Sequence, residues 1–107
     1  MKKTLFILAA AALGCSLPVH ASGNAEAGKA KSATCAACHG ADGNSAVPSF
    51  PKLAGQNRDY LYHALKDYKA GKRKNPIMAG QVQTLSDADM LDLAKYFSTQ
   101  KGLQLKY

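Results

Sequence analysis

The chain is short and basic. It has 107 residues, of which 47% are hydrophobic, and a formal net charge of +7. This length suits one small domain. The sequence contains no repeat, no low-complexity tract and no strand-like alternation of polar and apolar residues, which favours an all-α fold.

Residues 1–21 have the pattern of a secretory signal peptide. Two lysines follow the initiator methionine, residues 5–13 form a short apolar run, and Val19-His20-Ala21 suits cleavage. The apolar run is too short to span a bilayer. We therefore predict export to the periplasm and a mature domain over residues 22–107, whose net charge is +5 because the two lysines are lost.

Cys15 suggests an alternative end to this segment. In a bacterial lipoprotein, cleavage before the cysteine would leave it lipidated. The alanine three positions earlier, Ala12, suits such a site poorly, and ordinary cleavage removes Cys15 with the leader. We expect no lipid anchor and no transmembrane segment in the mature chain.

Residues 24–34 are predicted to form the first helix. Polar residues 22–24 can cap it, and the segment is rich in alanine and lysine. Gly28 lowers helix stability in the interior of this segment. Its expected purpose is the close approach of another helix, which a side chain would block.

The helix is expected to end at Cys35-Ala36-Ala37-Cys38-His39. Each thiol can add across one vinyl group of a porphyrin, and the histidine that follows can bind the iron from one side. The pattern predicts one haem c, bound covalently through Cys35 and Cys38, with His39 as an axial ligand. Because a domain this small buries little surface of its own, we expect the chain without haem to be poorly folded.

Two alternatives use the same cysteines. A structural zinc site needs four ligands, but the mature chain offers two cysteines and two histidines without a second closely spaced pair. A thioredoxin-like thiol–disulfide oxidoreductase has a strand before the motif and a helix after it. Residues 30–34 lack strand character, and Gly40 and Gly43 oppose a helix, so haem attachment is the favoured hypothesis.

A loop is predicted over residues 40–57. It contains three glycines and two prolines and shows no periodicity. Its apolar residues, Val47, Phe50 and Leu53, are expected to cover a face of the haem.

The next helix is predicted over residues 58–70. Its apolar residues at positions 61, 64, 65 and 68 form one stripe, and Gly71 is expected to end it. A last helix is predicted to begin at Ser86, which can cap it, and acidic residues in its first turn suit the helix dipole. Its apolar stripe consists of Met90, Leu93, Ala94 and Phe97.

Three residues could bind the iron opposite His39. His63 lies off the stripe of its helix and is expected at the surface, and Met90 is expected in the core. Met78 lies in residues 75–80, predicted to be irregular, where the backbone could bring its thioether to the iron. We therefore predict His39 and Met78 as the metal ligands, a pair that raises the reduction potential.

These residues resemble class I cytochromes c, especially small bacterial periplasmic members and single halves of the diheme periplasmic type. The resemblance covers most of residues 24–100, and the matching segments are 35–40, 50–56, 73–78 and 85–97. It implies three to four helices and loops wrapped around one haem, with the first and last helices crossing at Gly28. It also implies that the carbonyl of Pro48 accepts a hydrogen bond from the ring of His39. One Cys-x-x-Cys-His motif occurs, so we expect no fused second haem.

The predicted function is periplasmic electron transfer on one covalently bound haem, without enzymatic activity. A haem enzyme of the peroxidase type, in which Met78 leaves the iron, is an alternative, as is the thiol–disulfide oxidoreductase. The basic run Lys72-Arg73-Lys74 precedes Met78 and predicts redox partners with acidic docking surfaces, such as a membrane cytochrome complex, a terminal oxidase or a reductase. Nucleic acid is not expected as a partner in this compartment.

Overall fold

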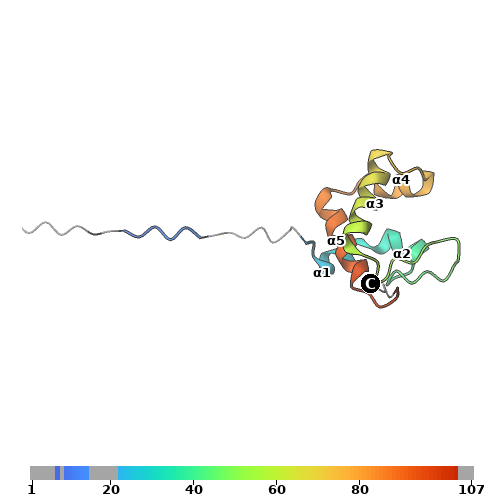
Figure 1. Ribbon diagram of the computed structural model, residues 1–107, viewed down its shortest axis with the longest axis horizontal. Coiled ribbons are helices and arrows are strands. Elements are labelled where there is room, and N and C mark those ends of the chain that lie inside the picture. The colour runs from blue at the N-terminus through green and yellow to red at the C-terminus, as the bar shows by residue number, and fades with distance from the viewer. Residues whose placement is uncertain (1–6, 8, 15–21, 104–107) are drawn as a thin grey trace, which may run out of the picture.

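The computed structural model describes residue 7, residues 9–14 and residues 22–103 (Figure 1). The predicted signal peptide falls largely outside these residues, and so does Cys15. The described part of the predicted signal peptide, residues 7 and 9–14, contains no helix or strand. In the part of the chain that the structure describes, no helix has the length and apolar character needed to cross a bilayer.

The described residues form five helices and no strand, which confirms the all-α prediction (Figure 1). The predicted number of three to four helices was wrong. The helices are α1 (Ala25–Lys31), α2 (Ala33–His39), α3 (Arg58–Ala70), α4 (Pro76–Val82) and α5 (Asp87–Ser98).

The single helix predicted over residues 24–34 is two helices, and the cysteine motif lies within the second. Ser32 separates them, because its backbone N–H and its hydroxyl both donate to the carbonyl of Lys29, at 3.2 and 2.8 Å. The carbonyl of Ser32 then accepts from Cys35 and Ala36, which begins α2. Alanine-rich composition predicted the helix, but this local serine geometry divided it.

Helix α4 occupies a segment that was predicted to be irregular. The side chain of Asn75 accepts from the backbone N–H groups of Ile77 and Met78, at 3.0 and 3.1 Å, and Pro76 occupies the first turn. Asparagine as N-cap followed by proline is a typical helix start. The residues that cap α4 were therefore visible in the sequence, and the prediction of an irregular segment here was wrong.

Helices α1 and α5 cross at Gly28, as predicted. A Cβ atom at this position would lie 2.1 Å from the carbonyl oxygen of Asp92 and 2.8 Å from Cβ of Tyr96. Backbone contact of this kind leaves no room for any side chain. The crossing brings the end of α1, and with it the start of α2, against the C-terminal helix.

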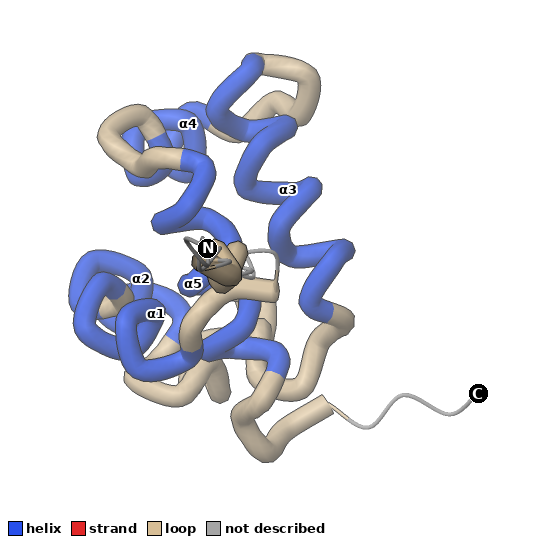
Figure 2. Tube along the Cα trace, turned by 90° about the vertical axis from the view of Figure 1, so that its left-hand side faces the viewer, coloured by secondary structure: helices blue, strands red, loops and turns tan. Residues whose placement is uncertain are grey.

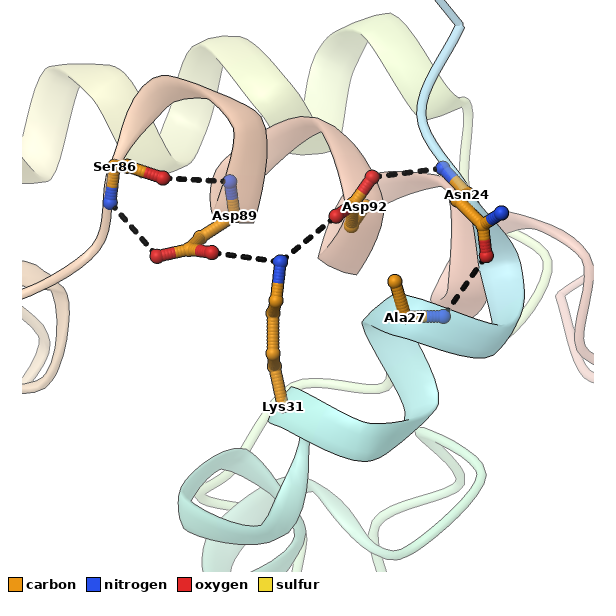
Figure 3. Close-up of polar contacts among 6 residues, drawn as sticks. All are labelled: Asn24, Ala27, Lys31, Ser86, Asp89 and Asp92. Atoms are coloured by element: carbon orange, nitrogen blue, oxygen red, sulfur yellow. Dashed lines mark hydrogen bonds and ion pairs between the residues drawn. The ribbon is translucent and has the colours of Figure 1, made fainter. Parts of the chain in front are cut away.

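Charged groups hold the same crossing together (Figure 3). Nζ of Lys31 lies 2.7 Å from Asp89 and 2.8 Å from Asp92, and the other carboxylate oxygen of Asp92 accepts from the backbone N–H of Asn24 at 2.8 Å. Asp89 also accepts from the backbone of Ser86, which completes a capping box at the start of α5. We call Lys31, Asp89 and Asp92 the α1–α5 clasp.

The core lies between α3 and α5. It is formed by buried side chains from both helices, namely Leu61, Leu93, Ala94, Tyr96 and Phe97. Loop 40–57 is tied to the end of α5, since the hydroxyl of Tyr96 donates to Ala41 at 2.8 Å and the N–H of Gly55 donates to Phe97 at 3.0 Å. The loop is therefore held beside α2, where it can form a wall of the site.

Candidate haem site

A cavity of about 320 Å³ lies between α2 and α4. In Figure 2 helix α4 lies above α2, and the two belong to different packed pairs, since α2 contacts α1 and α4 contacts α3. Cys35, Cys38 and His39 line the cavity from α2, and Met78 lines it from α4. The structure therefore brings two thiols, one imidazole and one thioether to the same cavity from two directions.

The remaining wall is mostly apolar. Helices α3, α4 and α5 and the loop all contribute apolar side chains to it. These side chains are Phe50, Leu53, Leu61, Ala64, Leu65, Ile77, Leu93, Ala94 and Phe97. Phe50 and Leu53 are two of the three loop residues predicted to cover the haem, while Val47 is 47% exposed and does not line this cavity. An apolar wall combined with this donor set fits a haem.

His39 is held in one tautomer. Its side chain is buried, and Nδ1 lies 2.7 Å from the carbonyl oxygen of Pro51. Because a carbonyl can only accept, Nδ1 carries the proton and donates, and Nε2 keeps its lone pair. A neutral imidazole in this state is suited to bind a metal, and the second hydrogen bond fixes the ring orientation.

The acceptor is Pro51, so the prediction of Pro48 was wrong. The N–H of Phe50 donates to the carbonyl of Val47 at 3.1 Å, which closes a turn with Pro48 exposed in it. The N–H of Leu53, two residues after Pro51, donates to Gly43 at 2.8 Å and draws this part of the loop back toward the end of α2. Two prolines in one loop have the same local signal, and long-range backbone bonds decide which one reaches His39.

The three candidates for the second axial ligand have different surroundings. Met78 is half-buried and lines the cavity. Met90 is only 4% exposed, belongs to the core as predicted, and does not line the cavity. His63 is exposed and also lies away from it. Among these three residues, Met78 alone is positioned to face a group held by His39.

Cys35 is poorly suited to thiol redox chemistry. Burial raises the pKa of the Cys35 thiol, which disfavours the thiolate. Reactive cysteines of thiol–disulfide oxidoreductases have a lowered pKa instead. Cys35 and Cys38 lie one helical turn apart on α2 and both line the cavity, which suits attachment to a group inside it.

Sequence reasoning missed several residues of the cavity. Arg73 was considered only as part of a surface charge run, yet it lines the cavity together with Tyr60, Tyr68 and Asn75. The exposed run of three cations in the sequence suggested solvation. Only the turn after α3, which brings this segment back over the helix, shows that its middle residue, Arg73, lines the cavity although it is itself exposed.

An all-α fold around an apolar cavity, with a Cys-x-x-Cys-His helix on one side and a methionine on the other, defines a c-type haem protein. The comparison with known proteins agrees: the family described as Cytochrome c matches residues 25–101. The chain belongs to the cytochrome c family. Its cofactor is haem c, bound covalently through the arrangement of Cys35 and Cys38.

Relatives of about the length of this domain and of about twice that length are similar to it. Cytochrome c4 of Pseudomonas aeruginosa is 54% identical over 89 residues, which are 83% of this chain and 44% of that protein. Cytochrome c-554(548) of Halomonas halodenitrificans is 44% identical over 82 residues, which are 74% of this chain and 99% of that protein. The crystal structure of reduced cytochrome c4 from Pseudomonas stutzeri superposes with a TM-score of 0.72 at 52% identity, covering 76% of this chain and 47% of that one. The chain spans about half the length of the cytochrome c4 relatives.

Proposed function

We propose that this chain is an exported one-electron carrier of the periplasm, in which His39 and Met78 are the axial ligands of the haem. The observation that carries this proposal is the position of Met78 on α4, across the same cavity from His39 on α2. The N-terminal pattern of residues 1–21 supports export, and the mature domain would begin at Ser22.

The chain's own residues position both ligands. The carbonyl of Pro51 holds the imidazole of His39 with its Nε2 lone pair available, and the cap at Asn75 holds the first turn of the helix that carries Met78. When bound, the haem supplies an iron that alternates between the ferrous and ferric states. The apolar side chains around it would exclude water and favour the state of lower charge.

The same arrangement favours a carrier over an enzyme. With an imidazole and a thioether on the two sides, the iron would have no open position for a substrate. A peroxidase-type enzyme would need Met78 to leave, and α4 packs against α3 and begins with a doubly bonded cap, which opposes this movement. Electron transfer to and from other proteins is therefore the function that the site supports best.

The partners we propose are redox proteins with acidic docking surfaces, such as a membrane cytochrome complex, a terminal oxidase or a reductase. Lys72 and Lys74 are exposed, and Arg73 between them lines the cavity. The basic run therefore lies beside the site where the electron would leave or enter. Electrostatic steering of this kind acts mainly on the rate of encounter.

An absorption spectrum of the haem-loaded protein tests the proposal. Expression of the full chain in a host with haem-attachment machinery should give a six-coordinate, low-spin c-type spectrum with a sulfur-to-ferric-iron charge-transfer band, and ferrous protein that does not bind carbon monoxide. A high-spin spectrum with rapid binding of carbon monoxide would support the haem enzyme instead. Absence of covalent haem would contradict the proposal entirely.

A further inference from the structure

Two basic side chains line the cavity, and among the described residues that form its wall there is no aspartate or glutamate. The cations are Lys52, from the loop beside His39, and Arg73, from the turn between α3 and α4. A haem carries two propionate side chains, which are anionic at neutral pH. Covalent attachment through the vinyl groups leaves these two carboxylates free, so the cavity must offer them either water or a cation.

Arg73 is already held in place on this wall. Its guanidinium lies over the ring of Tyr68, 4.9 Å from the centroid, and Nη1 donates to the hydroxyl oxygen of Tyr60 at 3.3 Å. Its backbone N–H donates to the carbonyl of Asp67 at 3.1 Å, which fixes the turn that carries it. Tyr60 accepts from Arg73, so its own hydroxyl proton remains available for another acceptor.

No carboxylate of the described residues pairs with this guanidinium. The ion pairs found among the described residues involve Lys31 and Arg58 as the cations. The hydroxyl of Tyr60 raises the pKa of Arg73, so the group stays charged at every pH of interest. Lys52, by contrast, makes no hydrogen bond or ion pair with a described residue, so its ammonium is not fixed toward the cavity.

We propose that Arg73, supported by Tyr60 and Tyr68, binds a propionate carboxylate of the haem. An arginine offers two parallel N–H donors to a carboxylate, and its stacking on an aromatic ring reduces the entropy lost on binding. The chemistry of the macrocycle agrees with this location, because the propionates belong to the two pyrrole rings that do not carry the thioethers. The turn that holds Arg73 likewise lies away from α2 (Figure 2). The inference rests on haem in the proposed orientation, with its thioethers on α2, and is independent of the electron-transfer role.

Substitution of Arg73 tests the assignment through the reduction potential. In haem-loaded protein, the potential is measured from pH 4 to pH 9 for wild type, Arg73→Gln and Arg73→Lys. A neighbouring cation lowers the pKa of a carboxyl group by about 1 to 3 units. In Arg73→Gln we expect the fall of the potential with increasing pH to begin about 1 to 3 pH units higher than in the wild type. We also expect a lower potential at pH 7. Arg73→Lys should show a smaller shift, because the positive charge remains and only the pair of parallel N–H donors is lost.

The flanking lysines provide matched controls. Lys72→Gln and Lys74→Gln remove the same charge within one residue of Arg73, but neither side chain lines the cavity. Both should leave the pH profile in place. If Arg73→Gln behaves like these controls, or if Lys52→Gln produces the shift instead, the assignment to Arg73 is wrong. The sulfur-to-iron band is recorded in every variant, so loss of the axial ligand, which would contradict the proposed function, is distinguished from loss of the propionate contact.

Discussion

At the scale of single residues, burial separates side chains that have the same chemistry. Met78 and Met90 both offer a thioether, but Met90 is 4% exposed within the core and Met78 faces the cavity. Pro48 and Pro51 both offer a carbonyl, but only that of Pro51 lies within hydrogen-bonding distance of His39. In each pair the residue type defines what the group can do, and the packing around it decides whether it does so.

Met78→Ala is expected to abolish the sulfur-to-ferric-iron charge-transfer band completely and to lower the reduction potential, because the thioether stabilises ferrous iron. The matched variant, Met90→Leu, replaces a core methionine by a side chain of similar volume and should leave both nearly unchanged. Absorption spectra and redox titration of the two haem-loaded variants check this. Loss of the band in Met90→Leu with its retention in Met78→Ala would contradict the assignment.

At the scale of helices, the α1–α5 clasp links the two ends of the domain. Lys31 bonds to two carboxylates of α5, and this holds the pKa of Asp89 at about 2 and raises that of Lys31. Burial opposes ionisation of Asp92, but the bonds from Lys31 and the backbone of Asn24 still hold its pKa below the usual range. The clasp stabilises the crossing at Gly28, where α1 must lie directly against the backbone of α5.

The clasp should weaken in acid. Asp89 has a lower pKa when folded than its usual 3.8, so its contribution to stability is complete above that value and is lost as the pH falls toward about 2. Lys31→Met should lower the free energy of unfolding by about 1 kcal/mol at pH 7, with a difference that shrinks toward zero at pH 2. Urea unfolding of the haem-loaded protein at several pH values measures this.

Lys29→Met is the control for this experiment. Lys29 belongs to the same helix and is exposed, and no ion pair of the described residues involves it. Its stability curve should follow that of the wild type. If Lys31→Met lowers the free energy of unfolding by the same amount at pH 2 and pH 7, the effect comes from packing of the lysine stem and not from its charge.

At the scale of the whole molecule, the helices that carry the proposed ligands do not pack directly against each other. Helix α2 contacts α1, and α4 contacts α3 (Figure 2). The cavity lies between α2 and α4. The haem would join these two parts, because it is attached to α2 and would be bound by Met78 on α4. Without it, the apolar wall would face water over most of its extent.

Cys35→Ala combined with Cys38→Ala is therefore expected to give a chain without cooperative structure. Circular dichroism should show most of the helical signal lost, and urea should produce a gradual change in place of a transition. The single variant Cys35→Ala keeps one possible thioether, and its helical signal should lie between those of the wild type and the double variant. A fully helical, cooperatively unfolding double variant would show that the side chains alone sustain the fold.

Association with an acidic redox partner should depend on ionic strength. The second-order rate of electron transfer is expected to fall at least about tenfold from low to high salt. Lys72→Glu combined with Lys74→Glu should slow it further at low salt, and stopped-flow absorbance measures both effects. Glu26→Lys, an exposed charge change on α1, should have little influence. A rate that is flat across ionic strength and unaffected by the charge reversals would mean that apolar contact governs docking.

What the sequence determined by itself is the chemistry and its local framework. The spacing of Cys35, Cys38 and His39 follows from the covalent chemistry of haem attachment, and Ser86 capped its helix as predicted because capping is a contact within four residues. The close approach at Gly28 was also predictable, since a glycine inside a helix is costly without such a reason. The start of α4 at Asn75 and Pro76 was equally local and could have been predicted from the same rules.

The tertiary structure alone decided which residues meet. The choice of Pro51 over Pro48 depends on bonds from Leu53 to Gly43, and the exposure of Arg73 to the cavity depends on how the chain turns after α3. Met78 reaches the same cavity as His39 only because α3 packs against both α4 and α5. These contacts join residues that are distant along the chain, so no short pattern encodes them, and their geometry arises from the packing of the complete domain.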